Sequence, residues 1–169
     1  MYPKSRRAQT VFLDLFFAVG FFLLLIGLVL ITSINLKYKS EQNMIKDDLE
    51  REAILISDML VQGPGYPSSW ESNRSVVETF GLAGIDHQIQ FSKLLAFKRI
   101  TDSDYNKSKQ ILGIENEDFF VQMRYKNGTI LATTGNLMPQ GHVVNMKRAV
   151  VYNNNEALLV LAIWRAELE

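Results

Sequence analysis

The side chains that carry out most enzymatic and metal chemistry are scarce in this sequence. None of the 169 residues is a cysteine, which excludes thiolate zinc sites, iron–sulfur clusters and cysteine nucleophiles. One of the two histidines, His87, lies in the predicted loop Asp86–Gln88, and the other, His142, follows Gly141 ahead of a predicted strand. No catalytic constellation emerges from these residues. We therefore predict neither an enzyme active site nor a bound metal or cofactor.

A single carboxylate, Asp14, stands at the start of a long apolar run. Residues 15–31 read LFFAVGFFLLLIGLVLI, and the run continues to Ile34 with Thr32 and Ser33 as its polar positions. A charge costs roughly 2.5–3.5 kcal/mol at the centre of a bilayer and less near an interface. Two interpretations of Asp14 stay open. It lies at the headgroup level, where a helix N-terminus favours an acid, or it pairs with a positive group on another helix of a protein assembly.

Three Asn-x-Ser/Thr triplets suggest a different chemistry, the attachment of N-linked glycans. The triplets begin at Asn73, Asn106 and Asn127, and we predict that all three lie in loops or turns beyond the apolar run. We expect at least one of them to carry a glycan if the cell glycosylates its surface proteins.

The apolar run is long enough to form a membrane-spanning helix, which needs about 20 apolar residues. The segment before it carries Lys4, Arg6 and Arg7 and no acid, so the positive-inside rule places the N-terminus in the cytoplasm and everything after Lys37 outside. The competing interpretation is a secretory signal peptide, whose apolar region spans about 7–15 residues before a small-residue cleavage site. The present run is longer, and residues 32–35 match such a site poorly.

Beyond Lys37, the spacing of apolar residues predicts that the helix continues with one apolar face. Ile45, Leu49, Ala53 and Leu60 recur at helical spacing between charged residues. The sequence Gly63-Pro64-Gly65 cannot continue a helix and must end it.

The remainder of the chain predicts a small α+β domain. We expect a loop over residues 70–83, a helix over residues 93–99 capped by Ser92, and a second helix that begins at Asp102 or Ser103 and ends at Gly113. From Asp118 the period changes to two, and Asn127-Gly128 predicts a hairpin turn into residues 129–133. Residues 143–152 and 157–165 predict a second strand pair. Together these strands predict an antiparallel sheet of about four strands, whose apolar face the amphipathic helix covers.

The N-terminal order of residues resembles a known export signal. The stretch Lys4-Ser5-Arg6-Arg7-Ala8-Gln9, followed by Asp14 and the apolar run, resembles the class III signal of archaeal type IV pilin-like proteins. The resemblance implies that a prepilin peptidase cuts between Ala8 and Gln9 and that the helix is retained. It also implies that Asp14 neutralises the new α-amino group of a neighbouring subunit and so sets the axial register. The family usually has Gly before the cut, where this chain has Ala8, and its acid is more often a Glu one position earlier.

The resemblance extends into the region beyond the helix, where it implies a fold and a surface location but no ligand. The stretches that carry it are Ser57–Val61 and Gly63–Pro67 with Trp70, Gly81–Ala83, Ser92–Leu94, and Tyr105 with Lys109 and Leu112-Gly113.

The leading hypothesis is therefore a type IV pilin-like filament subunit, a minor pilin rather than a major one. We divide it into a basic leader (residues 1–8), a transmembrane and assembly helix (9–36), an amphipathic continuation (37–62) and an extracellular α+β domain (63–169). Its implied partners are other pilin subunits, the prepilin peptidase, the assembly platform with its ATPase, and the membrane before assembly. The runner-up is a signal-anchored single-pass protein whose outer domain binds a ligand or partner.

The balance of charge bears on both hypotheses. The sequence has 18 basic and 18 acidic side chains, so it lacks the basic excess of a general nucleic-acid-binding protein. Loss of the leader would remove three basic side chains and no acidic one, and would leave a mildly acidic mature chain.

Overall fold

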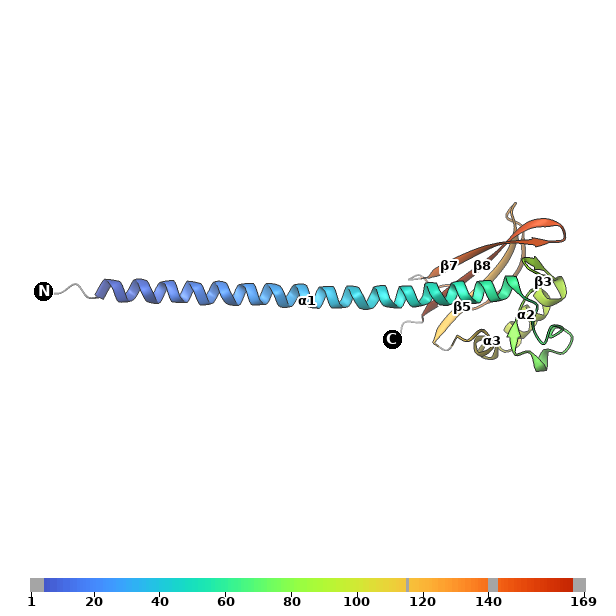
Figure 1. Cartoon of the computed structure of the whole chain (residues 1–169), viewed down its shortest axis with the longest axis horizontal. Coiled ribbons are helices and arrows are strands. Elements are labelled where there is room, and N and C mark those ends of the chain that lie inside the picture. Colours follow the sequence, from blue (N-terminus) through green and yellow to red (C-terminus); the bar gives the residue numbers. More distant parts are fainter. Residues whose placement is uncertain (1–4, 115, 140–142, 166–169) are drawn as a thin grey trace. The chain divides into compact units, whose positions relative to one another are not determined.

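The N-terminal half of the chain is dominated by one long helix. The computed structural model describes the backbone of residues 5–114, 116–139 and 143–165, and their side chains from Asp14 onward except at positions 41, 42 and 74. Helix α1 runs from Ser5 to Gln62 (Figure 1) and ends where Gly63 and Pro64 were expected to stop it. Contacts group the chain into two units, residues 1–45 and 46–169, so the last turns of α1 belong with the sheet. We call the second unit the head.

The last turns of α1 bury the apolar face that the sequence predicted. Leu49, Ala53, Ile56 and Leu60 are all buried, whereas the intervening Glu50, Arg51 and Ile54 are exposed. Periodic placement of apolar residues is thus sufficient to identify which side of this helix packs on the rest of the head.

The strands of the described residues form two sheets. The six-stranded sheet has the order β3-β4-β7-β8-β5-β6, and a separate pair consists of β1 and β2. The bounds are β1 (Gly65–Tyr66), β2 (Thr79–Phe80), β3 (Ala83–Ile85), β4 (Gln88–Ile89), β5 (Glu117–Tyr125), β6 (Ile130–Gly135), β7 (Val144–Tyr152) and β8 (Asn155–Arg165).

The two predicted strand pairs are confirmed, but the expectation of a four-stranded antiparallel sheet is wrong. β5 pairs with β6 and β7 pairs with β8, both antiparallel, and β8 joins β5 to complete the expected four strands. β4 adds to β7 in parallel, which makes the sheet mixed, and β3 extends it by another strand. These added strands have two or three residues each, too few to show a period in the sequence. The segment expected to be a loop contains β2 and the short 3-10 helix Arg74–Val76.

Two helices precede the main strands, and their starts differ from the expected caps. Helix α2 runs from Phe91 to Ser103 and begins after Gln90, so Ser92 lies inside its first turn and does not cap it. Helix α3 (Tyr105–Leu112) is capped by Asp104, whose side chain accepts a hydrogen bond from the Lys107 N–H. Neither Asp102 nor Ser103 caps it. Gly113 ends α3 in the left-handed conformation, as predicted.

The core lies on one face of the six-stranded sheet. Odd-numbered residues 119–123 of β5 and 157–163 of β8 are buried on that face, beside the apolar face of α1. On the opposite face, even-numbered residues of β5 are half-buried, and burial is complete only at Ala162 and Trp164 of β8. This asymmetry is the expected pattern of an antiparallel ladder that is covered on one side.

A buried lysine holds together the loop that leaves α1. Lys93 of α2 is 2% exposed, and its Nζ donates hydrogen bonds to the carbonyl oxygens of Pro64 (2.5 Å) and Ser68 (2.6 Å). The same ammonium lies 3.4 Å from a Glu71 carboxylate oxygen and 5.8 Å from the centre of the Trp70 ring. We call these five residues the Lys93 cluster. The buried ammonium is thus offset by two carbonyl acceptors and a nearby carboxylate, although the Glu71 oxygen that faces it accepts no hydrogen bond.

Two glycines allow the backbone segments around the Lys93 cluster to approach one another closely. Gly65 has a φ of +77°, and a Cβ there would lie 2.5 Å from the Thr79 carbonyl oxygen. A Cβ at Gly81 would collide with the backbone of Gly65 and Gly63. Trp70 fills the adjacent space, and its indole N–H donates to the carbonyl oxygens of Pro64 (3.0 Å) and Gly81 (3.1 Å).

We expect the substitution Lys93→Met to destabilise the head by about 3 kcal/mol or more, because it leaves the Glu71 carboxylate and two buried carbonyl groups without their cation. Trp70 and Trp164 are both buried in the head, so tryptophan fluorescence during urea unfolding measures the head alone. The control is Lys98→Met on the same helix, where an exposed pair with Asp102 is worth a few tenths of a kcal/mol. Equal losses in the two variants would contradict a special role for Lys93.

Candidate functional site

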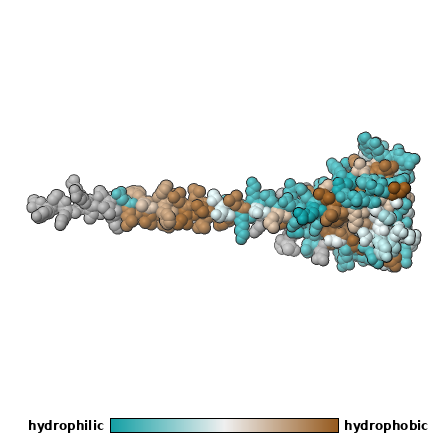
Figure 2. Space-filling model, viewed as in Figure 1, coloured by the Kyte–Doolittle hydropathy of each residue, from teal (hydrophilic) through white to brown (hydrophobic). Residues whose placement is uncertain are grey.

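The N-terminal segment of α1 presents an apolar surface that no other described residue covers. Its large side chains from Leu15 to Leu36 are 40–70% exposed, with the phenylalanines among the most exposed. Figure 2 shows this segment as a continuous hydrophobic surface, followed by hydrophilic residues. By length and composition this helix is able to cross a membrane. Exposed apolar area of this extent is rare in proteins that stay in water, and marks a membrane or protein interface.

Asp14 and Lys37 bracket this apolar surface. Residues 15–36 carry no charge, and at 1.5 Å per residue they span about 33 Å, close to the roughly 30 Å of a bilayer core. Thr32 lies inside the span, and its hydroxyl donates to the carbonyl oxygens of Leu28 (3.0 Å) and Val29 (2.9 Å). The helix thereby satisfies its own polar side chain, as an apolar environment requires. Asp14 makes no ion pair with any other side chain that the structure describes.

The predicted cleavage site lies beyond what the structure describes in atomic detail. Lys4 is outside the described residues. Arg6, Arg7, Ala8 and Gln9 fall within the helical backbone of α1, but their side chains are outside the described part. The leader charge and the processing site therefore stay predictions.

A charged network ties the last turns of α1 to β7. Arg148 of β7 lies 2.8 Å from the Asp58 carboxylate and donates its Nε–H to the Ser57 hydroxyl at 3.0 Å. Ser57 is fully buried and in turn donates to the Ile54 carbonyl. Sequence analysis missed this connection, since Arg148 and Ser57 are 91 positions apart.

A second network lies at the far end of the sheet, where Glu117 of β5 faces Arg165 of β8. Arg165 donates to one Glu117 oxygen from both Nε (3.0 Å) and Nη2 (2.5 Å). Burial of Glu52 on α1 raises the pKa of its carboxyl, and the nearby Glu117 raises it further, against the opposing charge of Arg165. One Glu52 oxygen is buried without a hydrogen bond. Glu52 is thus an unfavourable charge at the helix–sheet contact.

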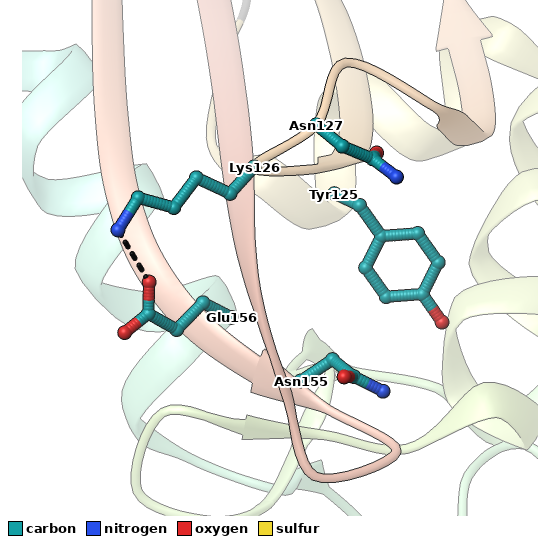
Figure 3. A pocket seen from close by; sticks show the side chains of 5 residues that line it. All are labelled: Tyr125, Lys126, Asn127, Asn155 and Glu156. Atoms are coloured by element: carbon teal, nitrogen blue, oxygen red, sulfur yellow. Dashed lines mark hydrogen bonds and ion pairs between the residues drawn. The ribbon is translucent and has the colours of Figure 1, made fainter.

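A polar pocket lies where two hairpin turns meet. It has a volume of about 440 Å³ and is lined by Tyr125, Lys126, Asn127, Asn155 and Glu156. Figure 3 shows Tyr125, Asn127 and Asn155 on one side of the ribbons and the Lys126–Glu156 ion pair on the other. The two charged groups are 2.7 Å apart, and the Glu156 carboxylate raises the pKa of the Lys126 ammonium. The volume falls within the range of pockets that bind small ligands, about 300–1,000 Å³.

The three glycosylation triplets occupy different local structures. Asn73 caps the 3-10 helix that follows it, and Asn127 lies at the exposed tip of the β5–β6 hairpin. Asn106 lies in the first turn of α3, so the expectation that it lies in a loop is wrong. All three side chains are exposed, and the structure does not test whether they carry glycans.

The histidines contribute no metal site within the described residues. His87 is partly exposed, pairs with the neighbouring Asp86 at 2.7 Å, and bonds through its backbone to Val61 and Val151. His142 lies outside the described residues. Among the residues that the structure describes, no group of three acidic or histidine side chains is placed to hold a metal ion.

No family model matches this chain, and no curated protein or solved structure is significantly similar to it. Its function is therefore argued from its own residues.

We expect the substitution Glu52→Gln to stabilise the head at pH 7 by a few tenths to about 1 kcal/mol, since it removes the unfavourable charge. A raised pKa means that the folded chain binds this proton more tightly than the unfolded chain does. The wild type therefore loses stability as pH rises from the ordinary carboxyl pKa of about 4.5 through the higher pKa of Glu52 in the folded chain.

Below that pH window, Glu52 is protonated in both the folded and the unfolded chain, so the stability gained by Glu52→Gln should vanish. Urea unfolding at pH 3.5 and pH 7 measures this difference. The matched control is Glu50→Gln, which changes an exposed acid two positions away. A gain that is the same at both pH values would contradict the assignment.

Proposed function

We propose that the protein is a subunit of a type IV pilin-like surface filament, anchored in the membrane before assembly and joined to its neighbours through the N-terminal part of α1. The observation that carries this proposal is a continuous uncovered apolar helix surface with a carboxylate, Asp14, at its N-terminal border. A lipid bilayer and a bundle of identical helices are both environments that such a surface fits.

The residues before the apolar run favour a filament over a simple anchor. A basic leader next to Ala8-Gln9 supplies a place where cleavage would create a new α-amino group close to Asp14 of a neighbouring subunit. An ion pair between that group and Asp14 would cost far less in an apolar bundle than either charge left alone there. This requirement would set the axial register of the subunits.

The head suits a role outside the membrane in which it catalyses no reaction. Its charged contacts, such as Arg148–Asp58 and Glu117–Arg165, join helix to sheet or strand to strand. The proposal assigns the head to the outer surface of the filament and the apolar part of α1 to its interior. Adhesion, DNA uptake, motility and secretion are all compatible with this arrangement.

The first test is the N-terminus of the mature protein. We expect protein isolated from the cell surface to begin at Gln9, because the leader would be removed on the cytoplasmic side before assembly. Mass spectrometry of the N-terminal peptide measures this directly. Recovery of Met1 or Tyr2 in the mature chain would contradict the filament proposal and favour the signal-anchored alternative.

The second test is the substitution Asp14→Lys, which would place two positive groups together at the subunit contact. We expect the amount of protein in sheared surface filaments to fall at least tenfold, the effect of losing about 1.4 kcal/mol or more of pairing. Tryptophan fluorescence of the head should not change. Asp48→Lys, an exposed acid outside the apolar segment, is the control. Undiminished incorporation of the Asp14 variant would contradict the register role.

A further inference from the structure

The β5–β6 turn has a geometry that distinguishes Asn127 from the other two glycosylation triplets. The Gly128 N–H donates to the Tyr125 carbonyl at 2.9 Å, and the Tyr125 N–H donates to the Thr129 carbonyl at 2.8 Å. Gly128 has a φ of +93°, whereas Asn127 does not adopt a positive φ. The turn is therefore a β-turn closed by a left-handed glycine rather than the two-residue turn that Asn-Gly usually forms.

This turn places Tyr125 and Asn127 on the same side of the hairpin. Figure 3 shows the Asn127 amide and the Tyr125 ring together, while the Lys126 side chain points the other way to its partner Glu156. The Asn127 Oδ1 accepts the Thr129 N–H at 2.9 Å, so its orientation is held. Its Nδ2 donates to no other group in the described part of the chain, and it is the atom to which an N-linked sugar is attached.

Asn155 completes the polar lining on this side of the pocket. Its Nδ2 donates to the Asn153 carbonyl at 2.9 Å, which leaves its Oδ1 without a partner among the described residues. Tyr125, Asn127 and Asn155 thus line one side of this pocket and the Lys126–Glu156 pair lines the rest, while the Tyr125 ring also packs on Tyr152, with 6.1 Å between the ring centres. A pyranose has an apolar face of C–H groups and a rim of hydroxyl groups, and this combination matches that chemistry.

We propose that Asn127 is N-glycosylated and that its first sugar occupies this pocket, with its apolar face against the Tyr125 ring and a hydroxyl donating to Asn155 Oδ1. The inference rests on the proposed function in one respect, that the head lies outside the membrane. The co-reactant is an oligosaccharide linked to a lipid phosphate, used by a membrane oligosaccharyltransferase. The bond from the sugar C1 to the phosphate oxygen breaks, the bond from C1 to Asn127 Nδ2 forms, and the lipid phosphate leaves with the proton that Nδ2 loses.

The other two triplets lack these features. Asn106 lies in α3. Ser108, the third residue of its triplet, is fully buried, and its hydroxyl donates to the Asp104 carbonyl. The folded chain therefore does not present this triplet to a transferase. Asn73 is exposed, but Glu71 stands two positions before it, where Asn127 has Tyr125. A glycan at Asn73 would extend into solvent without an aromatic surface to cover.

The experiment inserts the full chain, with an added C-terminal Asn-Gly-Thr tail, into microsomes or secretory cells that transfer N-acetylglucosamine-based glycans. Tryptic mass spectrometry then measures occupancy at Asn73, Asn106, Asn127 and the tail. We expect modification of the tail and of Asn127, and none of Asn106. Modification of the tail with an unmodified Asn127 overturns the proposal.

The added tail also distinguishes an unmodified Asn127 from a head that lies on the cytoplasmic side of the membrane. An unmodified tail would show that the head stays in the cytoplasm, which overturns both the outward orientation and the glycan. A modified tail supports the orientation whatever happens at Asn127.

The second measurement tests the pocket itself. Glycans are trimmed enzymatically to a single N-acetylglucosamine, and thermal unfolding of the head is followed by tryptophan fluorescence for the wild type, Asn127→Gln, Tyr125→Leu and the double variant. We expect the sugar to raise the Tm by about 4 °C when Tyr125 is present and by less than about 1 °C when Leu replaces it. The sugar at Asn73, removed in the control Asn73→Gln, should leave the Tm unchanged. Equal shifts with and without Tyr125 would overturn the stacking contact.

Discussion

The buried ammonium group of Lys93 organises the region on which the rest of the head depends. By binding the carbonyl oxygens of Pro64 and Ser68 and the carboxylate of Glu71, it folds the chain that leaves α1 back against α2. With this loop closed, the Leu82 N–H reaches the Leu60 carbonyl and the His87 N–H reaches the Val61 carbonyl. These backbone bonds link the end of α1 to the strands β3 and β4. β4 in turn pairs in parallel with β7.

The Lys93 cluster also gives a physical reason for a pattern in the sequence. The short stretches that the sequence analysis singled out beyond the apolar segment include Gly63–Pro67, Trp70, Gly81–Ala83 and Ser92–Leu94, and the structure brings these stretches into contact. A second group, Tyr105 and Lys109, meets at the Asp118 carboxylate. Each residue type has a structural requirement there: a glycine where a Cβ would collide, an indole that bridges two carbonyls, and a lysine that neutralises a buried acid. These motifs are therefore explained by the fold, and they identify no ligand.

The two units of the chain satisfy different physical constraints. The head buries its apolar residues within itself, and two ion pairs, Arg148–Asp58 and Arg165–Glu117, connect α1 to β7 and β5 to β8. The apolar segment of α1 is covered by no other residue that the structure describes and has one acid at its border, which is the pattern of a membrane or protein interface.

The sequence by itself determined the features that depend on local periodicity and on glycine and proline: the end of α1 at Gln62, its buried face, the two hairpins and the end of α3. Each of these follows from neighbours within a few positions, where backbone geometry and side-chain spacing leave little choice. Tertiary structure decided the mixed sheet, the burial of Lys93, the raised pKa of Glu52, and the side of the hairpin on which Tyr125 and Asn127 meet. Strands as short as β3 and β4 have no period to detect, and Lys93 has the sequence signature of any exposed helix lysine. Their positions depend on partners tens of residues away, whose interaction energy exists only once the chain has folded.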